Sequence, residues 1–246
     1  MARVLIGLIG KKGSGKTTAL RVIEKELEPI QEIQLAKRLK DVCSKVFKID
    51  REYMDDPVLK EIDLDRPVSI TFWSIVKICF MFMVFPRIRT FKHIGKTLTT
   101  ARQLLQYVGT DILRDIDRKI HLKRALSGLP KNGIFVASDV RFKDEMEHLH
   151  KWAYPYGWFF YIDRNLKTVD FHASEANIGK LKKVSTRIIN NNGNMENLEN
   201  EIKASLVWAA NELPYIGYGP YKRQLERVKN QKWKSLQPSL LKRLFR

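Results

Sequence analysis

The sequence predicts an α/β fold in which a parallel sheet is flanked by helices on both faces. Two observations carry this prediction. Short apolar runs, typical of buried strands, alternate along the chain with stretches whose apolar residues recur at helical spacing. The first such run, at 3–9, is followed by a helical pattern at 16–27. Strands that are separated by helices run parallel, so ligands should gather at their carboxyl ends.

The remaining elements continue this alternation. Apolar side chains share one face of a predicted helix at 36–47, which follows a short strand at 30–35. Residues 50–67 are polar and rich in turn-forming residues. Beyond them the sequence predicts a mostly helical stretch at 102–125, a buried strand at 133–137, a helix near 142–152, a strand at 158–162, a last strand at 186–189 and a helix ending at about 210.

The composition predicts one globular unit with a sizeable core, because 44% of the 246 residues are hydrophobic. The two cysteines, Cys43 and Cys79, lack the spacing of a zinc site or a disulfide framework. A reducing compartment is therefore expected. The first residues run straight into a glycine-rich segment and do not form the regions of a signal peptide, so the predicted location is intracellular and cytoplasmic.

The formal net charge of +18 predicts an anionic partner. Residues 66–110 contain no acidic residue, and the tail from 211 onward is strongly basic. Such clusters suit an acidic partner, which could be nucleic acid, an anionic membrane surface or a protein. A solvated basic surface is the alternative, and a homodimer is left open.

Residues 72–85 form the most apolar segment of the chain. A helix that spans a bilayer needs about 20 apolar residues. This segment is shorter and contains Lys77, so the sequence favours a buried or groove-lining helix over interfacial membrane contact. In the tail, large apolar residues between 233 and 245 recur at near-helical spacing, which is typical of an amphipathic docking helix.

The segment after the first strand fits the phosphate-binding pattern G-x-x-x-x-G-K-[ST]. Its glycines let the backbone turn so that N–H groups point at phosphate oxygens, and the next helix adds its positive end. Lys16 would reach the β- and γ-phosphates, and the Thr17 hydroxyl would bind Mg²⁺. The alternative is a glycine-rich turn that binds nothing. The predicted nucleotide-binding residues here are Gly10, Lys12, Gly13, Ser14, Gly15, Lys16, Thr17 and Thr18.

Later blocks of the sequence share residues with a known family. In order, they are Asp63–Arg66, R-x-L-L-Q-x-x-G-T-D at Arg102–Asp111 with Arg114 behind it, S-D-V-R-F at Ser138–Phe142 with Glu145, His172–Glu175 and Ile189–Gly193. The blocks resemble the viral, phage-type deoxynucleoside monophosphate kinases of the P-loop kinase superfamily. The resemblance runs from residue 3 to about 207, and for a viral protein it implies the host cytoplasm.

The resemblance implies transfer of the γ-phosphate of ATP to a deoxynucleoside monophosphate, with ATP and Mg²⁺ bound. The implied catalytic residues are Lys16, Asp139, Arg141 and Arg164. The implied metal ligands are Thr17 and Asp139. The adenine would be cradled by Asn190 and Gly193, for which a simple turn is an equal explanation. The implied acceptor-binding residues are Arg66, Arg102, Gln106 and Asp111; for Arg102 and Gln106 the alternative is an ordinary exposed helical pair.

The resemblance also implies a domain organisation. Residues 1–212 would form the P-loop kinase domain, with a helical substrate-binding region at about 36–125 and a lid at about 163–183. Residues 213–246 would form a basic C-terminal tail. His172 and Glu175, within the lid, would either close it or form a structural pair.

Two features depart from the family pattern: Thr17 stands where many members carry Asp, and the block at 70–98 has no counterpart. A dephospho-coenzyme A kinase-like protein is one alternative, because it shares the late strand and Asn-Gly loop, although the block at 102–111 argues against it. The charge leaves a second alternative, a nucleotide-dependent protein that binds nucleic acid or a membrane.

Overall fold

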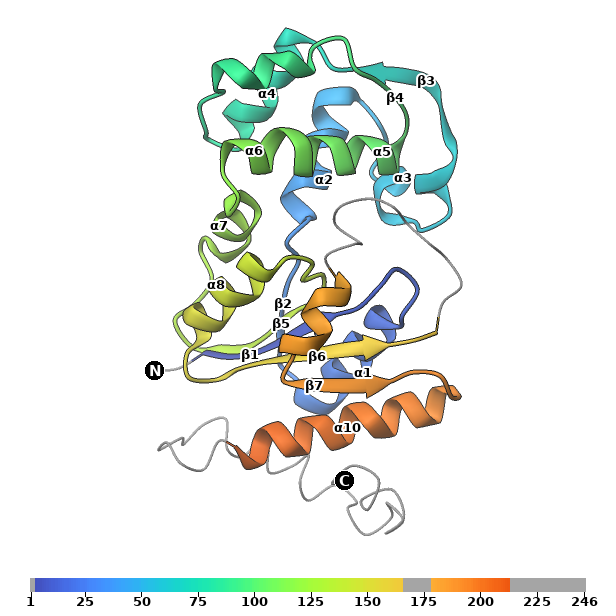
Figure 1. Ribbon diagram of the computed structural model, residues 1–246, viewed down its shortest axis with the longest axis vertical. Coiled ribbons are helices and arrows are strands. Elements are labelled where there is room, and N and C mark those ends of the chain that lie inside the picture. Colours follow the sequence, from blue (N-terminus) through green and yellow to red (C-terminus); the bar gives the residue numbers. More distant parts are fainter. Residues whose placement is uncertain (1–2, 166–177, 213–246) are drawn as a thin grey trace. The chain divides into compact units, whose positions relative to one another are not determined.

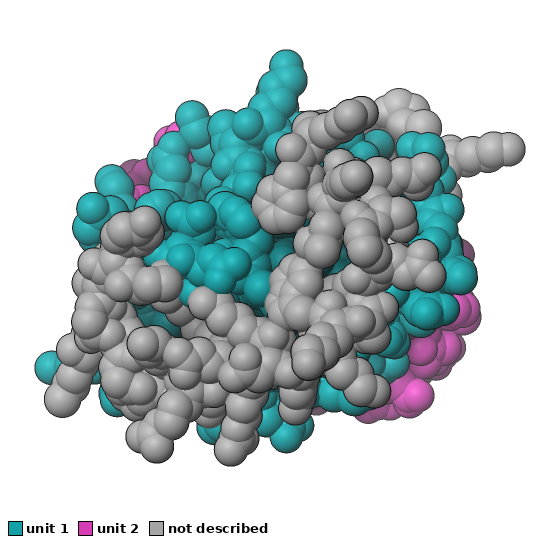
Figure 2. All heavy atoms as spheres, turned by 90° about the horizontal axis from the view of Figure 1, so that it is seen from below, with its two compact units in different colours: residues 1–32, 130–246 teal, residues 33–129 magenta. Residues whose placement is uncertain are grey.

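The chain folds into two compact units in the computed structural model. Unit 1 is built from residues 1–32 and 130–246, and unit 2 is Ile33–Leu129. Figure 1 follows the chain through its elements, and Figure 2 shows the atoms of each unit in its own colour. The helical region expected at about 36–125 falls within unit 2.

The structure describes residues 3–165 and 178–212. Several sequence predictions therefore lie outside the described residues. They are the basic tail at 213–246 and, within the expected lid, the part at 166–177 that contains His172 and Glu175.

Unit 1 contains a five-stranded sheet in the order β2-β5-β1-β6-β7. The pairs β1–β5, β1–β6 and β6–β7 are parallel. Gly7 of β1 pairs with Ala137 on one side and Phe159 on the other, so three strands end at the same edge. The strands are β1 Arg3–Ile9, β2 Gln31–Ile33, β5 Gly133–Ala137, β6 Gly157–Asp163 and β7 Arg187–Asn190.

Helices cover both faces of this sheet (Figure 1). Helices α1 (Lys16–Leu27) and α10 (Met195–Asn211) contact each other, and their apolar residues share one core cluster with Ile6 and Leu8 of β1. Side chains alternate along a strand, so the residues between these point to the other face. There α8 (Lys143–Ala153) packs on the sheet, and its His150 stacks on Phe159 of β6.

The predicted alternation of strands and helices is thus confirmed in unit 1. β1, α1 and β5 match the predicted ranges in both bounds, and β6 and β7 differ from theirs by one residue at each end. The short 3₁₀ turn Lys182–Val184 precedes β7.

Unit 2 is mainly helical and has its own core. Val42, Ile75, Ile78 and Leu104 belong to this core, together with the free, buried Cys79, whose thiol pKa is raised to about 11 by burial. The helices are α2 Lys37–Phe47, α3 Glu52–Asp55, α4 Phe72–Met81, α5 Ala101–Gln106, α6 Arg114–Ile116 and α7 Ile120–Leu126, with 3₁₀ turns at Leu59–Glu61 and Ile88–His93.

An antiparallel pair of strands in unit 2 was not predicted. β3 (Asp63–Ser69) pairs with β4 (Thr97–Thr100). Most side chains of β3 are exposed, and the register shifts between Asp63 and Val68. A strand without a buried apolar face gives little periodic signal, so the polar stretch at 50–67 predicted only turns.

The predicted helical stretch at 102–125 is interrupted by a π-helix at Tyr107–Leu113. Within it, Gly109 lies close to α2. A Cβ built on Gly109 would lie 2.6 Å from Cδ2 of Leu39, so a larger residue would have to displace a core side chain. π-helical turns are rare within α-helices, so helix propensity alone did not predict this one.

Helix α4 accounts for the apolar segment at 72–85. Thr71 caps it: Thr71 Oγ1 accepts from Ser74 N (3.1 Å), and Ser74 Oγ accepts from Thr71 N (2.8 Å). The expected burial holds for one face only, because Ile75 and Ile78 are buried whereas Trp73 and Phe80 are exposed. Within the part of the chain that the structure describes, no helix combines the length and apolarity that crossing a bilayer requires.

Candidate active site

The glycine-rich loop connects β1 directly to α1 (Figure 1). Gly10, Gly13 and Gly15 have φ angles of 157°, 75° and 103°, which residues with a side chain rarely adopt. Gly15 directly precedes helix α1 as its N-cap residue, with no side-chain cap from the described residues and no acidic residue in the first turn. The positive end of the helix therefore faces this loop without a neutralising carboxylate in that turn.

Lys16 folds back over the loop. Its Nζ donates to the carbonyl oxygens of Gly10 (2.6 Å) and Lys11 (2.8 Å). These acceptors hold the ammonium group beside the backbone that would receive phosphate. Ser14 is buried inside the loop, and Thr17 is exposed in the first turn of α1.

Two residues that follow later strands contact the loop backbone. Asn191, after β7, is buried and donates from Nδ2 to Ser14 O (2.7 Å). Arg164, after β6, donates from Nη1 to Gly13 O (3.2 Å). A Cβ on Gly15 would lie 2.5 Å from Asn191 Nδ2, so this glycine leaves room for the amide. The parallel strands thus bring distant residues to one loop.

Sequence reasoning predicted Arg164 at this site. It included Asn191 only within the segment 190–193 that would cradle the adenine, and did not predict its contact with the loop. The predicted residues Asn190 and Gly193 flank Asn191, and the only signal was the run of asparagines after a strand. Nothing in a single sequence indicates which of three consecutive amides points at the loop, because that depends on the end of β7.

Replacement of Asn191 by alanine is expected to loosen the loop. The buried Ser14 carbonyl would lose its donor, so the free energy of unfolding should fall by about 1–3 kcal/mol. The KM for ATP should rise by about tenfold, because roughly 1.4 kcal/mol of the binding free energy would then be spent on ordering the loop. Urea unfolding and steady-state kinetics measure both, with Asn211→Ala, an exposed position at the end of α10, as the matched control. An unchanged KM in Asn191→Ala would show that the amide does not order the loop.

The turn after β5 carries Asp139 and Arg141. Buried Glu145, in the first turn of α8, accepts hydrogen bonds from the backbone N–H groups of Arg141 (3.0 Å) and Phe142 (3.1 Å). This contact caps α8 and fixes the backbone from which the Arg141 side chain extends. Next to it, the Ser138 hydroxyl donates to the carboxylate of Glu32.

Removal of the Glu145 carboxylate by Glu145→Ala is expected to lower the free energy of unfolding by about 2–4 kcal/mol, because two half-buried N–H groups lose a buried, charged acceptor. Glu145→Gln keeps an acceptor oxygen and should cost less. Glu147→Ala is the matched control, since its ion pair with Lys143 is exposed and should contribute well under about 1 kcal/mol. Equal thermal stability of Glu145→Ala and Glu147→Ala would contradict the capping role.

The asparagine-rich segment after β7 builds a turn and a helix cap. Asn190 Oδ1 accepts from Asn192 N (3.0 Å), and Asn192 Oδ1 accepts from Asn165 N (2.7 Å). Asn194 then caps α10 by accepting from Asn197 N (2.8 Å). These contacts give the segment a structural role, and adenine binding by Asn190 and Gly193 stays a prediction.

In unit 2, Arg66 lines a pocket of about 350 Å³. Lys48, Lys77 and Trp73 also line it, and none of its described lining residues is acidic. Three cationic side chains and an indole ring are suited to an anion that carries an aromatic group.

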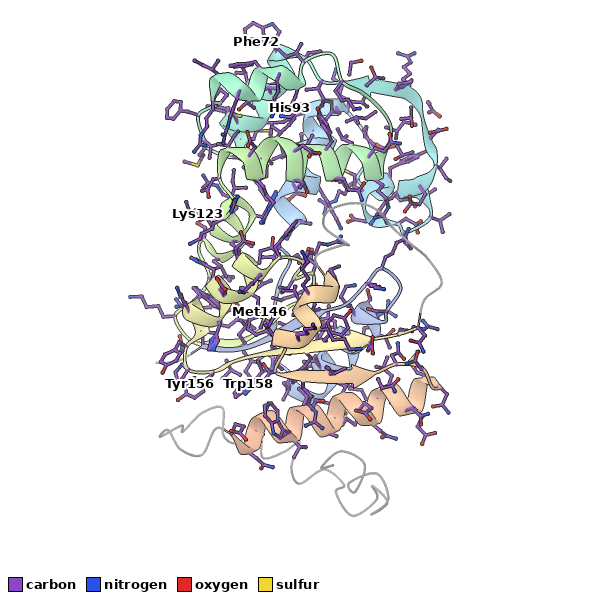
Figure 3. The ribbon with its side chains drawn as sticks, viewed as in Figure 1. Phe72, His93, Lys123, Met146, Tyr156 and Trp158 are labelled. Carbon is purple, nitrogen blue, oxygen red and sulfur yellow. The ribbon has the colours of Figure 1, made fainter. Side chains whose placement is uncertain are left out.

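Asp111 lines a different pocket of about 350 Å³, together with His93 and three basic residues, Lys92, Arg114 and Arg118. His93 is buried (labelled in Figure 3), and its Nδ1 lies 2.7 Å from the Tyr107 hydroxyl. Burial, followed by the charge of Lys92, lowers the pKa of His93, and Asp111 partly opposes them. The imidazole is therefore neutral at neutral pH. Burial and Asp111 also raise the pKa of Tyr107.

Arg102 and Gln106 lie on α5, which leads into the π-helix. Arg102 forms an ion pair with Glu61. Gln106 directly precedes the π-helix, and Asp111 lies within it. The structure does not place all four predicted acceptor residues in one pocket, because Arg66 and Asp111 line different ones.

Among residues 3–165 and 178–212, no group of three or more His, Cys, Asp or Glu side chains could hold a metal ion. The predicted ligand Thr17 lies in the first turn of α1, after the loop that follows β1, and Asp139 comes just after β5, the strand that pairs with β1.

A parallel sheet with a glycine-rich loop between its first strand and first helix, followed by lysine and threonine, is typical of P-loop nucleotide-binding proteins. The sequence pattern of the deoxynucleotide monophosphate kinase family matches residues 68–202, more than half of the chain. The chain therefore belongs to the deoxynucleotide monophosphate kinase family and is a phosphotransferase. The block at 70–98, for which sequence analysis found no counterpart, lies inside the matched range.

Two further proteins are similar to this chain. A protein of Acanthamoeba polyphaga mimivirus with the provisional name deoxynucleotide monophosphate kinase is 29% identical over 209 residues, which cover 76% of this chain and 89% of the relative. The solved structure of the dephospho-CoA kinase from Campylobacter jejuni is 14% identical in sequence, with a TM-score of 0.37. The match covers 84% of this chain and 97% of the chain of that kinase.

Proposed function

We propose that the protein transfers the γ-phosphate of ATP to a deoxynucleoside monophosphate, giving ADP and the diphosphate. One observation supports the donor side most directly. Lys16 and the positive end of α1 meet at a glycine loop whose backbone is held by Asn191 and Arg164. Such a cradle suits a polyphosphate. The family match supports the acceptor class.

The donor would be bound by the loop from Gly10 to Thr18. Its backbone N–H groups would contact the phosphates, and the Lys16 ammonium would leave its carbonyl acceptors to neutralise charge on the transferred group. Arg164, already in contact with Gly13 O, would supply a second positive charge from β6. Phosphoryl transfer depends mainly on such positioning and neutralisation.

Thr17 and Asp139 are the residues that would hold Mg²⁺. Thr17, in the first turn of α1, offers a hydroxyl, and Asp139, just after β5, offers a carboxylate. Both are oxygen ligands of the kind this ion prefers, and two protein ligands suffice because water and phosphate oxygens complete its shell. When bound, the ion neutralises charge on the phosphates.

The acceptor would be bound by unit 2. Arg66 and Arg102 offer guanidinium groups that fork onto phosphate oxygens, and Gln106 can both donate to and accept from a base edge. Gln106 directly precedes the π-helix that contains Asp111, and the two would act on the acceptor together. Arg141 would contact donor and acceptor phosphates together.

An ATP-coupled assay across the four deoxynucleoside monophosphates tests the proposal. At least one should be turned over, with dependence on Mg²⁺. Dephospho-coenzyme A and the ribonucleoside monophosphates serve as comparison acceptors. Turnover of dephospho-coenzyme A alone, or ATP binding without any phosphorylated product, would overturn the acceptor assignment.

A further inference from the structure

We propose that one surface of unit 2 attaches the protein to anionic membranes. This surface, the α4–η2 surface, consists of the exposed apolar side chains of α4 and of the segment that leads into the 3₁₀ turn Ile88–His93 (η2). Their exposed fractions are 69% for Trp73, 80% for Phe80, 77% for Met83, 91% for Phe85 and 92% for Ile88.

The exposure of these side chains does not come from a loosely packed segment. Between them in sequence, Ile75, Ile78 and Phe82 are fully buried in the core of unit 2. Helix α4 is therefore anchored through one face, while its Trp73 and Phe80 side chains stay exposed. Clusters of exposed apolar side chains on a well-packed element mark an interaction site.

The backbone geometry keeps the apolar groups outward. Trp73, Lys77 and Phe80 are spaced i, i+4, i+7 and so share one face of α4. Met83 has a φ of 51°, a left-handed conformation that ends the helix. Arg124 supports this turn, because its Nη1 lies 3.7 Å from Met83 Sδ and its Nη2 donates to Phe82 O. Figure 3 shows this region around Phe72.

The charges near the surface select an anionic partner. Lys77, Arg87 and Lys92 are exposed, and the sequence from 66 to 110 contains no acidic residue. Large apolar and aromatic side chains interleaved with basic ones are typical of proteins that lie at a membrane interface, where the apolar groups enter the acyl boundary and the cations meet lipid phosphates.

The same charges disfavour other occupants. A two-fold interface with a second copy would bring identical cations together. The tail at 213–246 is itself basic. Nucleic acid could use the cations and stack bases on Trp73, Phe80 and Phe85, but it would leave the exposed Met83 and Ile88 without an apolar partner. An anionic lipid surface satisfies both the apolar and the basic side chains.

Vesicle flotation of the full-length protein tests this inference. The protein should float with phosphatidylcholine–phosphatidylserine vesicles and much less with phosphatidylcholine alone, and higher salt should weaken binding. Phe80→Ser with Phe85→Ser should lower the partition coefficient by at least about tenfold. Arg87→Gln should lower it by roughly fivefold on the mixed vesicles only.

The matched control is Val58→Ser with Ile188→Ser, which removes exposed apolar side chains elsewhere and should leave flotation unchanged. Kinase activity without vesicles and thermal unfolding should be the same in the Phe80/Phe85 variant as in the parent, because neither residue belongs to the proposed active site. Failure of the parent to float, equal flotation of the Phe80/Phe85 variant, or an equal loss in the control would each overturn the inference. So would DNA binding or self-association that depends on Phe80 and Phe85 while vesicle binding does not.

Discussion

Lys16→Ala is expected to lower kcat for phosphoryl transfer by about a thousandfold. The ammonium would neutralise charge that grows on the transferred group, and one such donor is worth roughly 2.7–4 kcal/mol in the transition state. In the structure the group already lies at the loop, 2.6 Å from Gly10 O. Its loss would therefore remove a positioned charge. Lys11 and Lys12 are exposed on the loop and do not stand at the start of α1, so we do not expect either to replace it.

The variant should remain folded. Lys16 donates two hydrogen bonds to carbonyls of a partly exposed loop, each worth about 0.5–1.5 kcal/mol, so the loss of stability should stay below about 3 kcal/mol. Circular dichroism and thermal unfolding check this. Lys11→Ala is the matched control, since it removes a neighbouring lysine from a variable position of the motif, and its kcat should stay within about threefold of the parent. Turnover of Lys16→Ala at the parental rate would refute the lysine assignment.

The sequence was sufficient where local rules decide structure. Glycines at 10, 13 and 15 adopt the positive φ angles that the motif implied, and the apolar run before them is the central strand β1. The alternation of strands and helices also predicted where β6 ends. Arg164 directly follows that end and contacts the loop. These features follow from backbone sterics and from burial on both faces of a parallel sheet, which leave a continuous apolar run in the sequence.

The features that sequence reasoning missed depend on contacts between distant segments. Asn191 is one of three consecutive asparagines, and only the end of β7 directs it, rather than its neighbours, toward Ser14 O. The π-helix contains Gly109, which lies close to Leu39, about seventy residues earlier in the sequence. The exposed half of α4 could not be told from the buried half, because both are equally apolar in sequence.

Arg141→Ala is expected to reduce kcat by about a thousandfold, with a smaller change in the KM for ATP. A guanidinium that contacts both transferring and accepting phosphates acts chiefly in the transition state, and such arginines are worth about 10³–10⁵ in rate. Glu145 supports this role, because its carboxylate fixes the Arg141 backbone N–H at 3.0 Å. Single-turnover kinetics with saturating ATP would separate chemistry from binding.

Two companion variants make this prediction specific. Arg141→Lys keeps a positive charge but loses the fork that can span two phosphates, so it should recover only a minor part of the rate. Lys143→Ala removes a cation two residues away whose exposed partner is Glu147, and it should leave kcat unchanged. If Arg141→Ala and Lys143→Ala gave the same small effect, Arg141 would contribute only general surface charge. A large loss in Arg141→Ala with weak rescue by lysine would instead require a bidentate contact, because charge alone is common to both side chains.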